Sequence, residues 1–295
     1  MRVKNIKNEL YYFNIPYRNC LKLPDDVRFG IEIEFNMKNY NNYEGKLSIA
    51  QDLMKQKNYN YSYNICIEQK NQIELVSEVL KDDEKTWDEL QKVLSFIISN
   101  DGYCNDKNDA HVHICENMFN INPKGWLNFF KLWSVFEEDI FMFTNGFQNQ
   151  TRIGAKLYAR KINDICKTII NDFNIFNYIN VSALKNSKRY CINFNRLLYT
   201  SNKKYIQIKN IDDYNVLNTI EFRSPNGTLS NIVWQNNINF FINLLLSCSD
   251  NNFDVEKMNF LYDNKNLSTE FDLIDLVYKD ELDKMCFLKQ YYKIK

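Results

Sequence analysis

The chain is poor in glycine, with seven glycines among 295 residues. None of them forms a G-x-G-x-x-G fingerprint or a Walker A loop, so a nucleotide would have to be held by something other than a glycine-rich phosphate cradle. The chain also has no G-x-S-x-G elbow and no H-E-x-x-H helix. These absences remove the usual sequence signatures of P-loop enzymes, α/β-hydrolases and helix-borne zinc proteases.

Net charge is lacking as well, because 37 basic residues balance 37 acidic ones. That balance gives no reason to expect a nucleic-acid or anionic-membrane partner. The most apolar stretch, 240–246, contains an asparagine and is too short to span a bilayer. Since the first residues lead into no apolar h-region, we expect no secretory signal and a cytoplasmic protein.

The eight cysteines are scattered and form no Cys-x-x-Cys pair. Reduced thiols in a cytosolic protein explain this pattern better than a disulfide framework does. A nucleophilic cysteine, Cys104 or Cys115, near His111 and His113 stays open as an alternative. Nothing in the sequence marks either thiol as activated.

The most informative segment that is present covers 29–35, where four apolar side chains alternate with Gly30, Glu32 and Glu34. Alternation of period two predicts a β-strand with one packed face and one polar face. Glu32 and Glu34 would lie about 6–7 Å apart on the polar face. Two carboxylates at that distance repel each other, and a hard divalent cation beside them would remove the repulsion. A solvated outer face is the plainer explanation.

The same alternation recurs around 72–76, 111–114 and 219–223. Both histidines of the chain fall on one face of their strand, and Glu68 keeps an even offset from Glu74. One such strand is commonplace, whereas four strands whose polar faces carry metal-ligand chemistry are not. Beyond Glu32 and Glu34, these faces would present Glu68, Glu74, His111, His113, Glu221 and Arg223.

The remaining pattern predicts helices interspersed with strands and contains no linker or internal repeat. One α+β domain with a mostly antiparallel sheet accounts for it most simply. We expect strands over 28–36, 63–80, 110–116, 189–195 and 218–224, and helices over 46–57, 84–99, 123–143, 155–172, 230–247 and 269–290. We divide the chain into a lead-in (1–27), a catalytic domain (28–250) and a C-terminal helical extension packed on that domain (251–295).

Five short motifs in this order resemble the amidoligase family, relatives of glutamine synthetase and glutamate–cysteine ligase among the carboxylate–amine ligases. The resemblance covers roughly 28–245. One departure concerns Glu68, which stands where such proteins tend to carry an aspartate. The motifs are Phe29-Gly-Ile-Glu-Ile-Glu-Phe35, Glu74-Leu-Val-Ser77, His111-Val-His113, Arg189-Tyr190 followed by Asn193, and Thr219-Ile-Glu-Phe-Arg223 with Gly227-Thr-Leu229.

The resemblance implies a cupped antiparallel sheet of the glutamine-synthetase catalytic-domain type, backed by helices. It implies an enzyme that uses ATP and Mg²⁺ or Mn²⁺ to join a carboxylate to an amine through an acyl phosphate. Divalent ions would neutralise phosphate charge while a guanidinium supports the phosphoryl oxygens. The partners would be carboxylate and amine substrates, as small molecules, peptides or proteins, with no nucleic acid and no membrane.

The resemblance also implies the metal ligands, which fall into two sets. Glu34 and Glu74, with Glu68 as a further candidate, would bind one ion. Glu32, His113 and Glu221 would bind a second ion, and Glu32 and Glu221 would thereby belong to the catalytic set.

The same resemblance implies which residues contact the nucleotide. Arg223 would bind phosphate or the reacting carboxylate and completes the catalytic set with Glu32 and Glu221. His111 would contact nucleotide or orient its neighbours. Arg189 and Arg152 are candidate phosphate clamps, with ordinary surface arginines as the alternative.

Two other classes of function stay open. A metal-dependent hydrolase would use the same carboxylates and histidine to activate water. A non-catalytic metal- or nucleotide-binding module of the same fold would keep the ligands without turnover. Dependence of a reaction on ATP separates the ligase from both.

Overall fold

The computed structural model describes residues 2–38, 63–68, 72–115, 123–171, 189–194 and 219–294. The helix predicted over 46–57 lies outside these residues. Within them, helices and an antiparallel sheet share one hydrophobic core, which is an α+β arrangement.

The sheet joins the strands that the alternating pattern predicted. Its order is β2 (Tyr63–Glu68), β3 (Gln72–Ser77), β1 (Phe29–Met37), β5 (Ala110–Cys115), β7 (Thr219–Phe222) and β6 (Ile192–Asn193), while β4 (Gly102–Tyr103) pairs with β1. Every pairing between these strands is antiparallel. The prediction that the polar strands share one sheet is confirmed.

The register of the central strands brings their polar residues together. Glu32 on β1 lies opposite His111 on β5, and His113 on β5 lies opposite Glu221 on β7. On the other side of β1, Glu34 lies opposite Glu74 on β3. Because the side-chain period of a strand is two, this register places these residues on the same face of the sheet.

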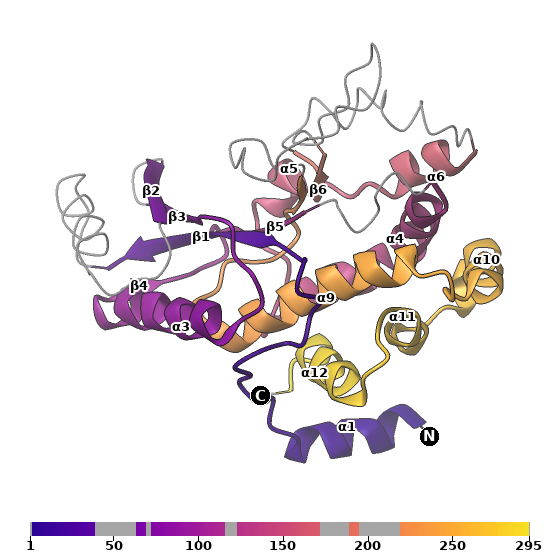
Figure 1. Cartoon of the computed structure of the whole chain (residues 1–295), viewed down its shortest axis with the longest axis horizontal. Coiled ribbons are helices and arrows are strands. Elements are labelled where there is room, and N and C mark those ends of the chain that lie inside the picture. The colour runs from indigo at the N-terminus through magenta and orange to yellow at the C-terminus, as the bar shows by residue number, and fades with distance from the viewer. Residues whose placement is uncertain are drawn as a thin grey trace, which may run out of the picture.

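Three helices cover the apolar face of the sheet: α3 (Glu84–Ser99), α4 (Pro123–Thr144) and α9 (Asn231–Ser249) (Figure 1). Phe222 of β7 stacks on Phe241 of α9 with ring centroids 4.1 Å apart, and it lies 5.9 Å from Trp133 of α4. Phe29 of β1 stacks on Trp87 of α3. This aromatic layer fixes the strands against the helices and leaves the polar residues on the opposite face.

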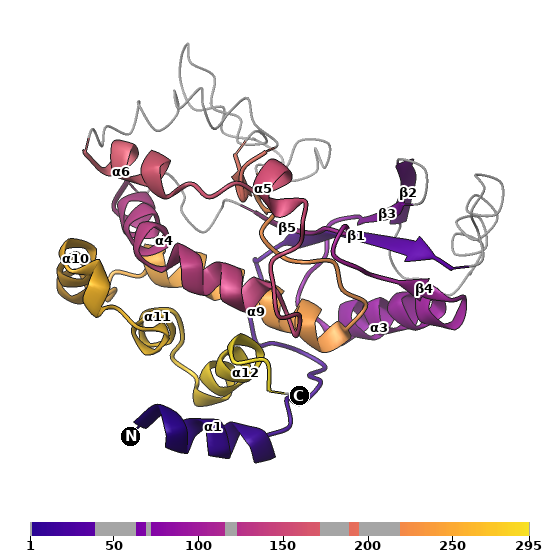
Figure 2. The same cartoon turned by 180° about the vertical axis from the view of Figure 1, so that it is seen from behind.

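An outer layer of helices covers the other side of α4 and α9 (Figures 1 and 2). It consists of α10 (Val255–Asp263), the short η2 (Lys265–Leu267), α11 (Glu270–Val277) and α12 (Glu281–Tyr291), and α1 (Arg2–Tyr12) packs against α12. Phe287 of α12 stacks on Phe143 of α4 with centroids 4.3 Å apart. The lead-in, which the sequence showed only as a polar segment, therefore begins with a helix, and the helix predicted over 269–290 is two helices.

The helix predicted over 155–172 is also wrong in its continuity. The structure has α5 (Ala155–Tyr158) and α6 (Asn163–Asn171), separated by a segment that pairs with the chain before β6. The backbone N–H of Arg160 donates to the carbonyl of Arg189, and the carbonyl of Arg160 accepts from Cys191. These bonds replace the helical bonds that residue 160 would otherwise make. β6 itself is shorter than the strand predicted over 189–195.

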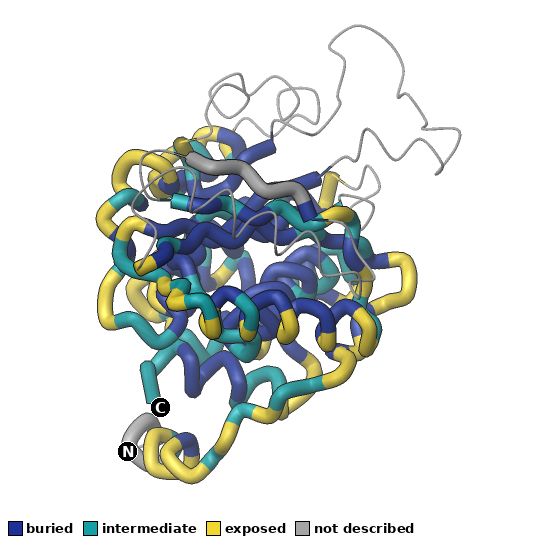
Figure 3. Tube along the Cα trace, turned by 90° about the vertical axis from the view of Figure 1, so that its left-hand side faces the viewer, coloured by how far each residue is buried: buried dark blue, intermediate teal, exposed yellow. Residues whose placement is uncertain are grey.

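Burial is continuous through the sheet and the helices beneath it, and exposed residues gather on the outer turns (Figure 3). No helix in the described part of the chain is both long enough and apolar enough to cross a membrane.

Candidate functional site

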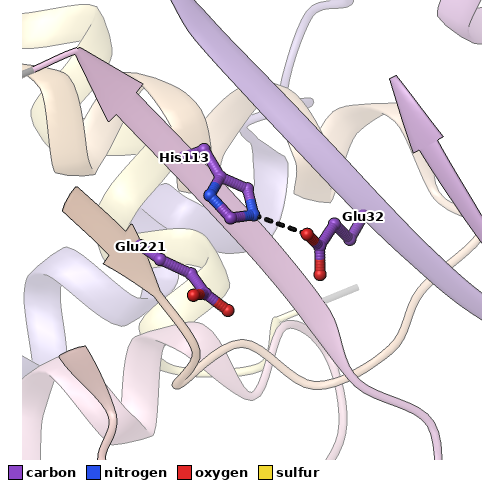
Figure 4. Close-up of side chains that lie close together, drawn as sticks. All are labelled: Glu32, His113 and Glu221. Carbon is purple, nitrogen blue, oxygen red and sulfur yellow. Dashed lines mark hydrogen bonds and ion pairs between the residues drawn. The ribbon is translucent and has the colours of Figure 1, made fainter. Parts of the chain in front are cut away.

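Glu32 is the centre of the polar face. Its Oε2 lies 2.7 Å from Nδ1 of His111 and its Oε1 lies 2.8 Å from Nε2 of His113. These contacts join β1 to β5, and Figure 4 shows Glu221 of β7 approaching the same point from the next strand. All four side chains are buried. One carboxylate thus holds both histidines of the chain in fixed orientations.

Glu221 and Arg223 stand side by side at the end of β7. Nη1 of Arg223 forms an ion pair with Oε1 of Glu221. Asn193 of β6 donates from its side chain to Oε2 of Glu221 at 2.6 Å, and Nε of Arg223 donates to the carbonyl of Tyr158 at 3.3 Å. A guanidinium is therefore fixed at the edge of the carboxylate cluster.

The ligand atoms of the polar face form three compact groups, each with its atoms within 4.8 Å of one another. The group Glu32, His113 and Glu221 is one that the sequence predicted. The other two groups are Glu74 with Glu32 and His111, and Glu34 with Asp109 and His111. That Glu34 and Glu74, which lie opposite each other on β1 and β3, share one ion stays a prediction. The backbone of Glu68 is in β2, while its side chain lies outside the described part.

Asp109 is the site residue that the sequence reasoning missed. It is buried, and its backbone N–H donates to Oε2 of Glu34 at 2.7 Å. Gln72, which the alternation places on the polar face with Glu74, donates from its side chain to the same oxygen. Asp109 precedes His111 by two residues, so the even spacing that selected His111 and His113 would have selected it too.

Arg152 does not stand as the phosphate clamp that the sequence suggested. Its side chain has no exposed area and forms an ion pair with Asp109. It also donates to the carbonyls of Arg223, Ser224 and Pro225. Arg152 therefore ties the start of β5 to the end of β7 from within the protein.

Arg189, the second candidate phosphate clamp, lies just before β6. It is exposed, and its carbonyl accepts from the backbone of Arg160.

The electrostatics of the face depend on the two histidines. Burial alone would raise the pKa of Glu32, but hydrogen bonds with His111 and His113 outweigh it and hold the pKa well below its ordinary value. Burial would lower the pKa of His111, but its contacts with Asp109 and Glu32 raise it to about 9. Burial and the Asp109 carboxylate raise the pKa of Glu34 to about 7. The proton on His111 thus offsets part of the negative charge of this face.

The match to a protein family decides the classification. A model of the family described as "Putative amidoligase enzyme" matches residues 44–245, more than half of the chain. The chain belongs to the amidoligase family. The description is that of a ligase-type enzyme, as the motifs indicated. The matched region contains β3, β5, β6 and β7, whereas β1 precedes it. Among curated proteins, no match was found.

Proposed function

We propose that this amidoligase is an ATP-dependent carboxylate–amine ligase that forms an amide or isopeptide bond through an acyl phosphate. The observation that carries the proposal is the convergence of Glu32, His113 and Glu221 from three adjacent strands, with Arg223 held beside them. Membership of a ligase-type family favours bond formation over hydrolysis of an existing bond. We also propose that the sheet is of the glutamine-synthetase type and that 28–250 is the catalytic unit.

The donor set suits a divalent cation. Two carboxylates and one imidazole offer the oxygen and nitrogen ligands that Mg²⁺ or Mn²⁺ accepts. The fit is supported by Nδ1 of His113, which is buried and has no hydrogen-bond partner among the described residues. When bound, the ion would neutralise phosphate oxygens of ATP and so let two anions meet.

The residues of the chain have separate tasks in this reaction. Arg223 binds the oxygens of the transferring phosphoryl group, because a planar guanidinium can contact two oxygens at once. Glu221 and Asn193 fix the position of that guanidinium and of the adjoining carboxylate. Burial of Glu32 and His113 keeps water away from the reacting anions, which strengthens each electrostatic contact.

The chemistry then takes two displacements. An oxygen of the substrate carboxylate attacks the terminal phosphorus of ATP, and ADP leaves. The amine nitrogen attacks the carbonyl carbon of the acyl phosphate, the C–O bond to phosphate breaks, and the nitrogen loses a proton. Activation is needed because a free carboxylate has no good leaving group. Positioning and electrostatic stabilisation account for the rate.

The test is a screen for ADP and phosphate release with Mg²⁺ or Mn²⁺ against pooled carboxylates and amines. We expect release that needs both a carboxylate and an amine, and a product whose mass equals the two substrates minus water. Glu221→Gln is the matched control and should lose the release. Cleavage of amides without ATP would instead establish the hydrolase, and metal or nucleotide binding without turnover would establish the binding module.

A further inference from the structure

A cavity of about 310 Å³ lies among the helices, and none of the residues of the polar face lines it. Three segments that are far apart in the sequence form its walls: 18–24 of the lead-in, 243–250 at the end of α9, and 277–283 where α11 ends and α12 begins. The α9 residues that line the cavity lie on the opposite side of that helix from Phe241, which packs against β7. The helix α9 therefore separates this cavity from the sheet.

The walls of the cavity are largely apolar. Leu21, Leu23 and Val277 are buried, and Leu246 of α9 is half-buried. Pockets that bind small molecules have volumes of about 300–1,000 Å³ and combine apolar walls with a few polar groups. The size and walls of this cavity therefore suit a small ligand that is partly apolar.

The carboxylates that line the cavity already have partners within the protein. Asp283 forms an ion pair with Nη1 of Arg18 at 2.6 Å, and Asp250 forms one with Lys279 at 2.7 Å. Asp280 caps α12, where its side chain accepts from two backbone N–H groups. These carboxylates therefore give a cationic ligand little to bind.

The guanidinium of Arg18, in contrast, has a nitrogen to spare. Besides the ion pair of Nη1, the backbone N–H of Arg18 donates to the side chain of Gln235 at 3.1 Å, so the residue is held in place. Its Nη2 is buried and has no hydrogen-bond partner among the described residues. A buried donor without an acceptor is costly. An anionic group in the cavity would supply the acceptor.

Lys22 is a second cation at this cavity, and its backbone is strained. Its φ is 63°, in the left-handed region that residues with a side chain rarely adopt. The bonds on either side of it hold this turn, because the N–H groups of Leu21 and Leu23 donate to the carboxylate of Asp82 at 2.8 and 2.9 Å. Lys22 itself is exposed and forms no ion pair with another described residue. Strain of this kind is often kept where a ligand binds.

We propose that this cavity binds a small amphiphilic anion, a carboxylate with an apolar chain. The carboxylate contacts Arg18 and Lys22, and the chain packs on the leucines. This inference goes beyond the proposed function, because the cavity shares no residue with the Glu32–His113–Glu221 group. The bound carboxylate is therefore not the one that reacts, and its binding requires neither ATP nor metal.

The experiment is calorimetry of the full-length protein with hexanoate, without ATP or Mn²⁺. Hexanol lacks the charge, hexylamine reverses it and acetate lacks the chain. Wild type should bind one hexanoate per chain and each of the other three probes about 10-fold more weakly or less, since a charge-assisted hydrogen bond or a buried chain is lost.

Two variants and a control place the binding in this cavity. Lys22→Asn removes the ammonium but keeps a residue that tolerates a positive φ, and it should weaken hexanoate binding about 10-fold. Ser247→Phe puts a ring into the cavity and should abolish binding. Lys92→Gln removes an exposed lysine of α3 that does not line the cavity, and it should leave the affinity unchanged. Circular dichroism checks that each variant is folded.

Several outcomes would overturn the proposal. They are the absence of hexanoate binding, equal affinity for hexylamine, and unchanged affinity in Lys22→Asn. If Ser247→Phe does not fold, alkylation of Cys20 by iodoacetamide replaces it, because this exposed thiol lines the cavity and bound hexanoate should slow the reaction. An unchanged rate at Cys20 would also overturn the proposal. Each of these results leaves the proposed function intact, and a protein without ligation could still bind hexanoate.

Discussion

The two faces of the central sheet are almost equally buried but differ in how well their groups are satisfied. On the apolar face, Ile31 is fully buried, and on the polar face Glu32 is 9% exposed. The apolar face meets a continuous aromatic layer, whereas the polar face buries carboxylates together with two imidazole nitrogens that lack partners within the described chain. Both faces are thus buried, but the charged and polar groups of the polar face are not all paired.

The apolar face stabilises the sheet, and the polar face carries the candidate site. Apolar burial stabilises the fold in proportion to the area removed from water. Buried carboxylates cost stability unless cations, protons or hydrogen bonds neutralise them. Such a face indicates a functional site, because groups with strongly perturbed pKa values gather at functional sites.

The largest effect is expected on the apolar face. Phe222→Ala removes the ring that stacks on Phe241 and contacts Trp133. The cavity should lower the free energy of unfolding by about 3–5 kcal/mol, measured by urea denaturation. A stable and active Phe222→Ala variant would mean that the two faces of β7 have been interchanged.

The neighbouring polar positions should show the reverse pattern. Glu221→Gln keeps the shape but loses the charge that a hard cation needs, and Arg223→Lys keeps the charge but loses the planar fork. Each should lower ATP-dependent ligation about 10²- to 10³-fold. Thermal unfolding of both variants should show a folded protein. Unimpaired ligation in both would remove the site assignment.

Metal should stabilise the polar face specifically. At a free concentration about 100-fold above the dissociation constant, Mn²⁺ with ATP should add about 2.7 kcal/mol to the free energy of unfolding. Thermal melts measure this shift, and Glu221→Gln should reduce it. An identical melting temperature with and without Mn²⁺ and ATP would contradict a nucleotide–metal site.

The pH dependence should change sign when metal is added. Folded His111 binds its proton more tightly than the unfolded chain does, so its contribution is complete below about pH 6.5 and is lost as the pH rises through about 9. The pKa of Glu34 is raised from 4.5 to about 7, so the folded protein also holds this proton more tightly than the unfolded chain does. The contribution of Glu34 to stability is therefore lost as the pH rises from about 4.5 to about 7.

Metal-free protein should therefore become less stable from about pH 5 to 9, with a limiting slope of about 1.4 kcal/mol per pH unit for each proton. With saturating Mn²⁺ the stability should instead rise from about pH 5 to about pH 6.5 and then level off, because the cation displaces those protons from the folded protein while the unfolded histidine still binds its own. Urea denaturation at several pH values measures both slopes. Equal slopes with and without Mn²⁺ would show that protons and metal do not share these ligands.

Alternation of period two carried most of what the sequence could predict. It placed Glu32, His113 and Glu221 on strands of one sheet, because a strand fixes which face each side chain occupies. The apolar spacing of 84–99 likewise matched α3, where Asp83 caps the first turn through Thr86. Local pattern was sufficient wherever neighbouring residues in the chain determine the structure.

The remainder depends on contacts between distant segments. The role of Arg152 is set by Asp109 and by carbonyls at 223–225, which no local pattern reveals. The break between α5 and α6 comes from pairing with the chain near Tyr190. Asp109 is different, since its spacing from His111 was visible and only the choice of motif boundary left it out.

The order of the ligands along the chain has a consequence for how the protein folds. Glu32 and His113 are separated by 81 positions, and Glu221 follows after a further long interval. Closing such loops is slow and is rewarded only once both ends are in place. A cation can therefore bind to all three ligands only when the chain is almost completely folded. Metal should slow unfolding and leave the rate of folding almost unchanged, because its ligands come together only after the aromatic layer has packed.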